Sequence, residues 1–400
     1  MGSFNTSEKS NFGGRTPGKI EASLNEKLRN VKWGEYEIGK LFTSSNGDFD
    51  IQKKHINGLG DYVVTSGLTD NGILGKTDVP ARIFEKGTIT VDMFGCAFYR
   101  QFQYKMVTHA RVFSLKPNQL ITDNQGLFLS NSLKFLSREF GYENMCSWEK
   151  IKSKTIPLPQ HNGDIDFDFM ESFIAELEAQ RIAELSAYLK VSGFDNYELS
   201  TEELDALQKF SNLDNDNWGT YRVGDLFEKV VTKKLPYKAK QLPKQPVDDY
   251  VLPCLTSSFQ NQGLNYYAPK TEATILSNVI SIPSNSDVYR AYYQTRDFTV
   301  LSDAYAIRWK LEGYKLSPNQ YLFMVMCINK VTDLPIYSYK NKLGGWNVVK
   351  EKYIRLPEIE GKIDFAFMEA FISAMKKLAI KDVVDYSNAK IRATKKVVSC

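Results

Sequence analysis

The sequence predicts an α+β protein made of two tandem copies of one strand-rich α/β globular unit, separated by an antiparallel pair of amphipathic helices with pseudo-twofold symmetry. Three observations support this prediction. A 22-residue passage that begins at Ile156 returns at Ile354 with 12 identical positions. Other matched segments occur in the same order in both halves. An apolar stripe at three- and four-residue spacing follows each copy of the passage.

The composition indicates a globular protein of more than one domain. The chain has 400 residues, of which 42% are hydrophobic, and such a length usually forms two domains. It contains no long apolar run and no apolar leader near its start, so we expect a cytoplasmic protein with no membrane partner. Five scattered cysteines and three histidines predict neither a disulfide framework nor a metal site.

The matched segments give the domain boundaries. WGEYEIGKLF at 33–42 matches WGTYRVGDLF at 218–227, and the offset between the copies grows from 185 to 198 along the chain. We therefore expect a flexible N-terminal tail over 1–20, a first globular domain with a short leading helix over 21–160, a first spacer helix and linker over 161–200, a second globular domain with its own leading helix over 201–358, and a second spacer helix with a C-terminal tail over 359–400.

Within each copy, local signals predict the order of elements. Short β-branched or aromatic runs such as DYVV at 61–64 are separated by turn residues and read as strands. The repeated prolines bring the chain out of the sheet in extended form, and Asp166 or Asp364 then lies where a helix cap is expected. The first spacer helix is expected over about 166–190, which is roughly 37 Å long.

The apolar stripe of the two helices has two interpretations. Its residues are Met170, Phe173, Ile174 and Leu177 in the first copy and Met368, Phe371, Ile372 and Met375 in the second. Taken singly, each helix is expected to pack on its own globular unit. The recurrence of the stripe favours the other interpretation, in which the helices pair and these residues form a helix-pairing and subunit interface.

No catalytic constellation is recognisable. The LGKT stretch at 74–77 lacks the first glycine of a phosphate-binding loop, because Asp70 stands at that place. The base-flipping motif of amino-methyltransferases and the nucleophile motif G-x-S-x-G are also absent. We therefore predict no catalytic residues, no metal and no cofactor bound by this chain.

The repeated passages resemble those of the specificity subunits of type I restriction-modification systems. The resemblance is carried by the W-x-x-[YF]-x-[IV]-G-x-L-F openings at Trp33 and Trp218, by the I-x-L-P-x(3)-G-x-I-D-F-x-F-M-E passages at Ile156 and Ile354, and by TDNGI at 69–73. It covers residues from about 21 to 385. The segment SGFDNYELSTEELDAL and the short helices are closer to forms that serve type IIB or other fused systems, so the type of system stays open.

The resemblance implies a non-catalytic DNA-recognition subunit. Two target recognition domains would each read one half of a bipartite double-stranded DNA sequence, and the helices would fix the spacing and dock methyltransferase subunits. The implied partners are two modification subunits, which would use S-adenosylmethionine for DNA methylation, and in many systems a restriction subunit. A helix of about 37 Å is close to one turn of B-DNA, about 34 to 36 Å.

Candidate DNA-binding residues lie in equivalent loops of the two copies. Arg, Asn and Gln side chains can pair with base edges, while Tyr and Lys side chains contact phosphates and position the protein. The loop candidates are Tyr99, Arg100, Gln101, Gln103, Tyr104 and Lys105 in the first copy and Arg290, Tyr292, Tyr293, Gln294 and Arg296 in the second. The turns at Asn71, Gly72, Gln262 and Gly263 are further candidates, and Lys233 and Lys234 are expected to contact the DNA backbone. For each Tyr or Arg, the alternative is a packed strand edge or a solvated side chain.

One competing function has the same helices. An interaction scaffold or decoy of a restriction complex would need no DNA contact, and therefore no basic loops on both copies. The salt dependence of DNA binding separates the two functions, since phosphate contacts make affinity fall steeply with salt.

Overall fold

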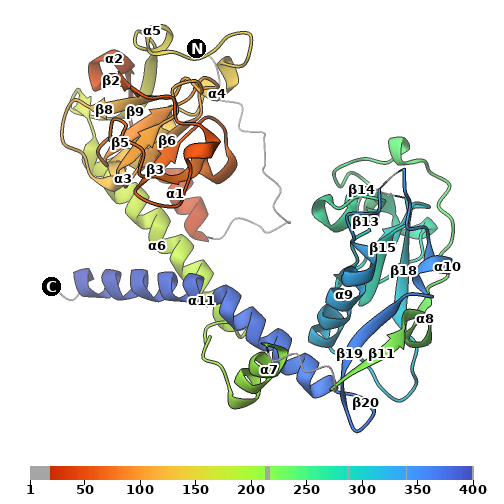
Figure 1. Cartoon of the computed structure of the whole chain (residues 1–400). Helices are drawn as coiled ribbons and strands as arrows, with labels where there is room; N and C mark the ends of the chain where they lie inside the picture. Colours follow the sequence, from red (N-terminus) through yellow and green to blue (C-terminus); the bar gives the residue numbers. More distant parts are fainter. Residues whose placement is uncertain (1–18, 212–216, 286–288, 339, 399–400) are drawn as a thin grey trace. The chain divides into compact units, whose positions relative to one another are not determined.

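The computed structural model describes residues 19–211, 217–285, 289–338 and 340–398 (Figure 1). The chain divides into two compact units. Unit 1 runs to Tyr188 and includes the end of the chain from Lys390, and unit 2 is Leu189–Ala389. Residues 1–18 of the expected N-terminal tail lie outside the described residues. No described helix is both long enough and apolar enough to span a bilayer.

Unit 1 interleaves helices and short strands. Its helices are α1 (Lys19–Asn30), α2 (Ile38–Leu41), η1 (Lys53–His55), η2 (Thr69–Gly72), α3 (Asp123–Ser132), α4 (Leu136–Glu139), α5 (Trp148–Ile151) and α6 (Phe167–Val191). Its strands are β1 (Trp33–Glu37), β2 (Phe42–Asn46), β3 (Asp61–Val64), β4 (Ile73–Thr77), β5 (Thr88–Val91), β6 (Ala97–Arg100), β7 (Tyr104–Met106), β8 (Phe113–Pro117), β9 (Thr155–His161) and β10 (Asp164–Ile165).

These strands form three small sheets. Their orders are β2-β8-β5-β6, β4-β3-β7 and β1-β9-β10. The pairings are antiparallel except that of β3 with β7, which run parallel with Tyr62 opposite Tyr104. The larger core lies between the four-stranded sheet and helices α3 and α6, and contains Ile89, Leu115 and Phe128. The buried positions of β3 and β5 carry β-branched residues, which favour strands, and both are inner strands of their sheets.

Unit 2 repeats this layout with different side chains. Its helices are α7 (Thr201–Ser211), α8 (Val223–Leu226), η4 (Ala239–Gln241), η5 (Gln260–Gly263), η6 (Lys270–Glu272), α9 (Pro318–Thr332), α10 (Trp346–Val349) and most of α11 (Phe365–Val398). Its strands are β11 (Trp218–Arg222), β12 (Phe227–Lys229), β13 (Tyr250–Leu255), β14 (Leu264–Pro269), β15 (Val279–Pro283), β16 (Tyr292–Gln294), β17 (Thr299–Val300), β18 (Ala304–Trp309), β19 (Tyr353–Ile359) and β20 (Lys362–Ile363).

The sheets of the two units correspond strand for strand. Those of unit 2 are ordered β12-β18-β15-β16, β14-β13-β17 and β11-β19-β20. The registers also correspond, since Arg100 lies opposite Thr88 on β5 and Gln294 lies opposite Val279 on β15. The predicted α+β class with tandem repeated domains is therefore confirmed.

The repeated proline passage performs the same structural task in both units. After the prolines, the chain turns through Asn162 or Glu360, both with positive φ (51° and 53°). Asp166 Oδ1 then accepts a hydrogen bond from the Phe169 amide at 2.8 Å, and Asp364 makes the equivalent bond at 2.9 Å. Both aspartates cap the helices that follow, α6 of 25 residues and α11 of 34.

The helix-pairing role predicted for the start of the stripe is wrong, because these residues pack on their own domains. Met170 and Phe173 belong to the core of unit 1, and Phe173 lies edge-on to Phe128. Met368 and Phe371 belong to the core of unit 2. The remaining stripe residues pack less completely: Ile174, Leu177 and Ile372 are half-buried against these cores, and Met375 is 45% exposed. Pairing of the two helices further along stays a prediction.

The leading helices fix each long helix to its domain. In unit 1, Lys27 of α1 forms an ion pair with Glu176 of α6. In unit 2, the buried Glu203 of α7 accepts hydrogen bonds from Ser373 at 2.6 Å and Lys377 at 2.9 Å, both on α11. These partners lower the pKa of Glu203 although its burial opposes them. Each long helix is thus clamped between its core and a short helix.

Candidate nucleic-acid interface

Arg100, one of the base-reading candidates from the sequence, points into the protein. Its side chain is only 2% exposed. Nε donates to Thr90 Oγ1 at 2.9 Å, and Nη2 donates to the carbonyl oxygen of Asn71 at 2.8 Å. Burial lowers the pKa of Arg100 to about 10. The prediction that Arg100 contacts a base is therefore wrong, since its side chain is buried and donates to Thr90 and Asn71 inside the domain.

Two neighbours of Arg100 are also structural. The Tyr104 ring is fully buried, and its hydroxyl lies 2.8 Å from Thr88 Oγ1 and 2.7 Å from Ser114 Oγ. Lys105 is 4% exposed, and its ammonium donates to the carbonyl of Val79 at 2.8 Å. β7, which carries both residues, is a buried edge strand packed against β3. Neither residue can reach DNA in this fold.

Tyr99 faces helix α3, and the two glutamines face solvent. The Tyr99 hydroxyl donates to Asp123 Oδ1 at 2.9 Å, and its ring lies over Gly126, where a Cβ would come within 2.1 Å of it. Burial raises the pKa of Tyr99. Gln101 and Gln103 are exposed and have no side-chain partner within the described ranges. They stay candidates for DNA contact, whereas Tyr99 packs between strand and helix.

The matching loop of unit 2 is more accessible but largely engaged. Arg290 is half-exposed and forms an ion pair with Asp333 at 2.7 Å, and this carboxylate raises the pKa of Arg290. The Tyr292 hydroxyl donates to the carbonyl of Phe259 at 3.1 Å, and Tyr293 stacks on the ring of Tyr321.

The other two candidates of this loop differ in their contacts. Gln294 donates to Ser281 Oγ at 3.0 Å and to the carbonyl of Gln262 at 3.3 Å. Arg296 is exposed, and no side-chain partner for it occurs in the part of the chain that the structure describes. Arg296 is therefore the cation of this loop that remains available to a phosphate or a base.

The lysine-rich segment and the glycine turns complete the candidate set. Lys233 and Lys234 are exposed on the irregular segment after β12. Asn71 and Gln262 are exposed at the tips of η2 and η5. Gly72 and Gly263 are buried with φ of 73° and 90°, so they shape the turns and do not offer a surface.

Two further left-handed residues of these turns, Asp70 and Asn261, were not among the candidates predicted from the sequence. Asp70 and Asn261 have φ of 47° and 46° and are exposed at the tips of the turns. The signal that could have found them is the polar pair directly before Gly in both copies, because Asn and Asp tolerate this conformation better than other side chains.

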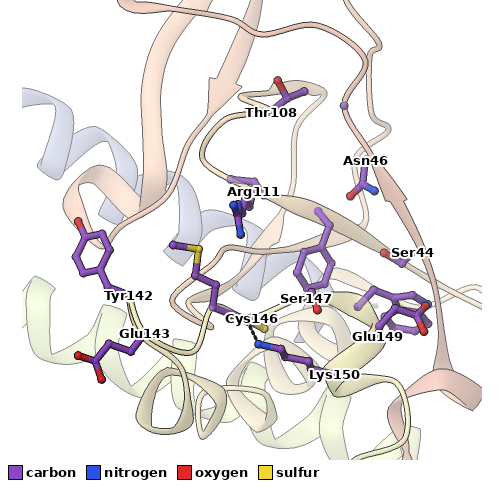
Figure 2. Close-up of a pocket in the computed structure, with 15 residues that line it drawn as sticks. Ser44, Asn46, Thr108, Arg111, Tyr142, Glu143, Cys146, Ser147, Glu149 and Lys150 are labelled. Atoms are coloured by element: carbon purple, nitrogen blue, oxygen red, sulfur yellow. Dashed lines mark hydrogen bonds between the residues drawn. The ribbon is translucent and has the colours of Figure 1, made fainter.

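A cavity of about 830 Å³ opens in unit 1, away from these turns (Figure 2). Figure 2 shows Arg111, Ser147 and Lys150 among its walls, and Lys150 donates to the carbonyl of Met145 at 2.8 Å. The thiol of Cys146, which also lines it, has its pKa raised to about 12 by burial and is no nucleophile at neutral pH. Nowhere in the described ranges do three or more His, Cys, Asp or Glu side chains gather in a way that could hold a metal ion.

Known proteins share this architecture. The chain matches the family model of the type I restriction modification DNA specificity domain twice, over residues 30–187 and 215–386. It is 23% identical over 354 residues to the type II restriction enzyme specificity subunit S.BcgI of Heyndrickxia coagulans, covering 88% of this chain and 96% of that one.

One of the solved structures found agrees in fold. The S subunit of a type I restriction-modification system from M. genitalium superimposes with a TM-score of 0.51 at 14% identity, over 92% of this chain and 94% of that one. The HsdS subunit from Thermoanaerobacter tengcongensis gives a TM-score of 0.31 at 11% identity, over 92% and 95%. Because the family model covers most of the sequence in two copies, the chain belongs to the type I restriction-modification DNA specificity family and is a non-catalytic specificity subunit.

Proposed function

We propose that this subunit reads a bipartite double-stranded DNA target, with one domain on each half-site. The observation that carries the proposal is that the two domains share sheet order and register but differ in the polar side chains of their exposed turns. Equal scaffolds with unequal turns are suited to two different half-sites. Gln101, Gln103 and Arg296 are exposed and have no side-chain partner among the described residues, and they would supply base contacts. Lys233 and Lys234 would contact phosphates.

The long helices would fix the distance between half-sites and dock the modification subunits. Each helix is anchored in its own core and held by a leading helix, which makes it a stiff extension of its domain. Beyond those anchors the helices carry exposed apolar side chains, including Tyr188, Leu378 and Tyr386 at 61%, 48% and 51% exposure. In the assembled complex, these side chains would lie against a partner subunit. Two modification subunits using S-adenosylmethionine, with or without a restriction subunit, would complete the complex.

Selection from a random duplex DNA pool tests the proposal. The full chain is used alone and together with a modification subunit of the same system. Enrichment of two short, different half-sites at a fixed gap is the expected result. A folded chain in a formed complex that enriches no sequence would favour the scaffold alternative. A steep loss of affinity between low and physiological salt is expected for DNA binding and not for a scaffold.

The spacing role needs a separate test. Inserting four residues into the exposed part of α6 lengthens that helix by about 6 Å. We expect the preferred gap to change by about 2 base pairs while both half-sites stay the same, since each base pair adds about 3.4 Å. A change in the half-sites themselves would contradict the spacing role.

A further inference from the structure

The two domains repeat an unusual turn at the tip of a hairpin. In unit 1, Asp70, Asn71 and Gly72 follow one another with φ of 47°, 53° and 73°. In unit 2, Asn261, Gln262 and Gly263 have φ of 46°, 55° and 90°. Successive left-handed residues other than glycine are uncommon and persist only where the surrounding structure holds them. The same strained backbone therefore occurs twice, between β3 and β4 and between β13 and β14.

A side chain from the neighbouring sheet holds each turn, the buried Arg100 in unit 1 and the half-buried Gln294 in unit 2. Arg100 and Gln294 occupy the same place in the two sheets, opposite Thr88 and opposite Val279. Arg100 joins the hydroxyl of Thr90 to the carbonyl of Asn71, at 2.9 and 2.8 Å.

Gln294 makes the same link in unit 2. It joins the hydroxyl of Ser281 to the carbonyl of Gln262, at 3.0 and 3.3 Å. Thr90 lies two residues after Thr88, the residue opposite Arg100, and Ser281 lies two residues after Val279, the residue opposite Gln294. A guanidinium and an amide thus perform one task, which is to fix the carbonyl of the residue at the tip of the turn.

Each turn presents an exposed amide side chain. Asn71 and Gln262 are exposed, and their side chains make no hydrogen bond to any described residue. An exposed apolar neighbour accompanies each, Leu68 at 74% and Phe259 at 51%. A carboxamide on a fixed backbone can donate and accept together, which is the pattern that an adenine edge requires in the major groove. Fixing the backbone lowers the entropy lost on contact.

We propose that Asn71 and Gln262 are specificity-determining residues that read a base edge, one in each half-site, and that Arg100 and Gln294 are the positioning residues that aim them. The inference rests on the proposed function, because it needs a DNA target. It adds which side chains read and how the fold holds them. The backbone is the same in both domains while the reading side chain differs in length, so the two turns would prefer different bases or steps.

The test compares base preferences of variants in the same DNA selection. Asn71→Gly removes the amide but suits the left-handed backbone, so the turn keeps its shape. We expect preference at one or two positions of one half-site to fall by about 5- to 150-fold, the range of a bidentate base contact. Gln262→Gly should do the same in the other half-site only. The matched control is Asn162→Gly, which also replaces an exposed asparagine with positive φ (51°) and should change no base preference.

The positioning role has its own variants. Arg100→Met removes the tether, and Arg100→Gln replaces it with the group that unit 2 uses. We expect Arg100→Met to flatten the same positions as Asn71→Gly without weakening binding to unrelated DNA, and Arg100→Gln to restore part of the preference. A merely structural role would weaken binding to every sequence equally. If Arg100→Met does not fold, Asn71→Gly still decides the reading role.

The outcomes separate the two proposals. If the unaltered protein selects two half-sites and Asn71→Gly retains both in full, the inference is overturned and the proposed function stands. An equal loss of affinity for all sequences in Asn71→Gly also overturns it, since that is the mark of a phosphate contact. If the unaltered protein selects no sequence, the proposed function fails and the inference falls with it.

Discussion

Replacing Glu171 by Ala is predicted to loosen the start of helix α3 without affecting unit 2. Glu171 lies on α6 and accepts hydrogen bonds from the Thr122 hydroxyl and from Asn124 Nδ2, the latter at 2.7 Å. Thr122 is also the N-cap of α3, where its hydroxyl accepts from the Gln125 amide at 3.2 Å. One carboxylate therefore joins the cap of α3 to α6.

The magnitude follows from these two bonds. A hydrogen bond to a charged group contributes about 1.5 to 3 kcal/mol, and the lower end applies here because Glu171 is half-exposed. Losing both bonds, while the cap stays in place, is expected to cost about 2 to 3 kcal/mol. If α3 opens locally, that cost corresponds to about 30- to 150-fold faster amide exchange there.

Hydrogen exchange measured by mass spectrometry on peptides of Asp123–Ser132 tests this. The second domain provides a matched control, because Glu369 accepts from the Ser317 hydroxyl and from Asn319 Nδ2 at 2.7 Å at the start of α9. Glu369→Ala should accelerate exchange in α9 and leave α3 unchanged. Unaltered exchange of α3 in Glu171→Ala, or equal acceleration of both helices by either variant, would refute the reasoning.

Three further predictions concern packing and thiol chemistry. Phe371 lies in a buried aromatic group, so Phe371→Ala should lower the free energy of unfolding by about 3 to 5 kcal/mol and lower the Tm of unit 2. Loss of subunit assembly at an unchanged Tm would contradict this prediction. Cys146 and Cys254 have their pKa raised to about 12 by burial, so at pH 8 both thiols stay protonated and should resist alkylation until the pH nears 12 or the chain unfolds; fast labelling of the native protein at pH 8, read by peptide mass spectrometry, would oppose this. Gly126→Ala should lower the free energy of unfolding by about 1 to 3 kcal/mol, because the added Cβ would lie 2.1 Å from the Tyr99 ring. An unchanged thermal unfolding curve of the variant would count against this prediction.

The duplication and the helix starts could be predicted from local sequence. The repeated passage marked both domains, and the first long helix was expected over 166–190 and runs from Phe167 to Val191. Caps and turns depend on residues close together in the chain, and Asp166 bonds an amide only three residues away. The duplication and the helix starts can therefore be predicted without a structure.

Which polar residues face outward could not be predicted in the same way. Arginine is a residue type that commonly contacts DNA, yet Arg100 is buried. Its guanidinium donates to the carbonyl of Asn71, which lies 29 residues earlier in the chain. The role of Glu171 likewise depends on Thr122. The periodicity of apolar residues shows which side chains share a face of a strand. It does not show which backbone group, distant in the sequence, accepts a hydrogen bond from a guanidinium.

The pairing of the first and last strands of each domain has a further consequence. β1 runs antiparallel to β9 with Trp33 opposite Pro159, and β11 runs antiparallel to β19 with Trp218 opposite Pro357. The chain therefore enters and leaves each domain at adjacent strands. The segment between those two strands therefore begins and ends at the same place in the domain. A segment of another length could replace it without displacing the flanking helices. Such an architecture would allow recombination to replace the interior of one domain while the other domain and the long helices keep their fold.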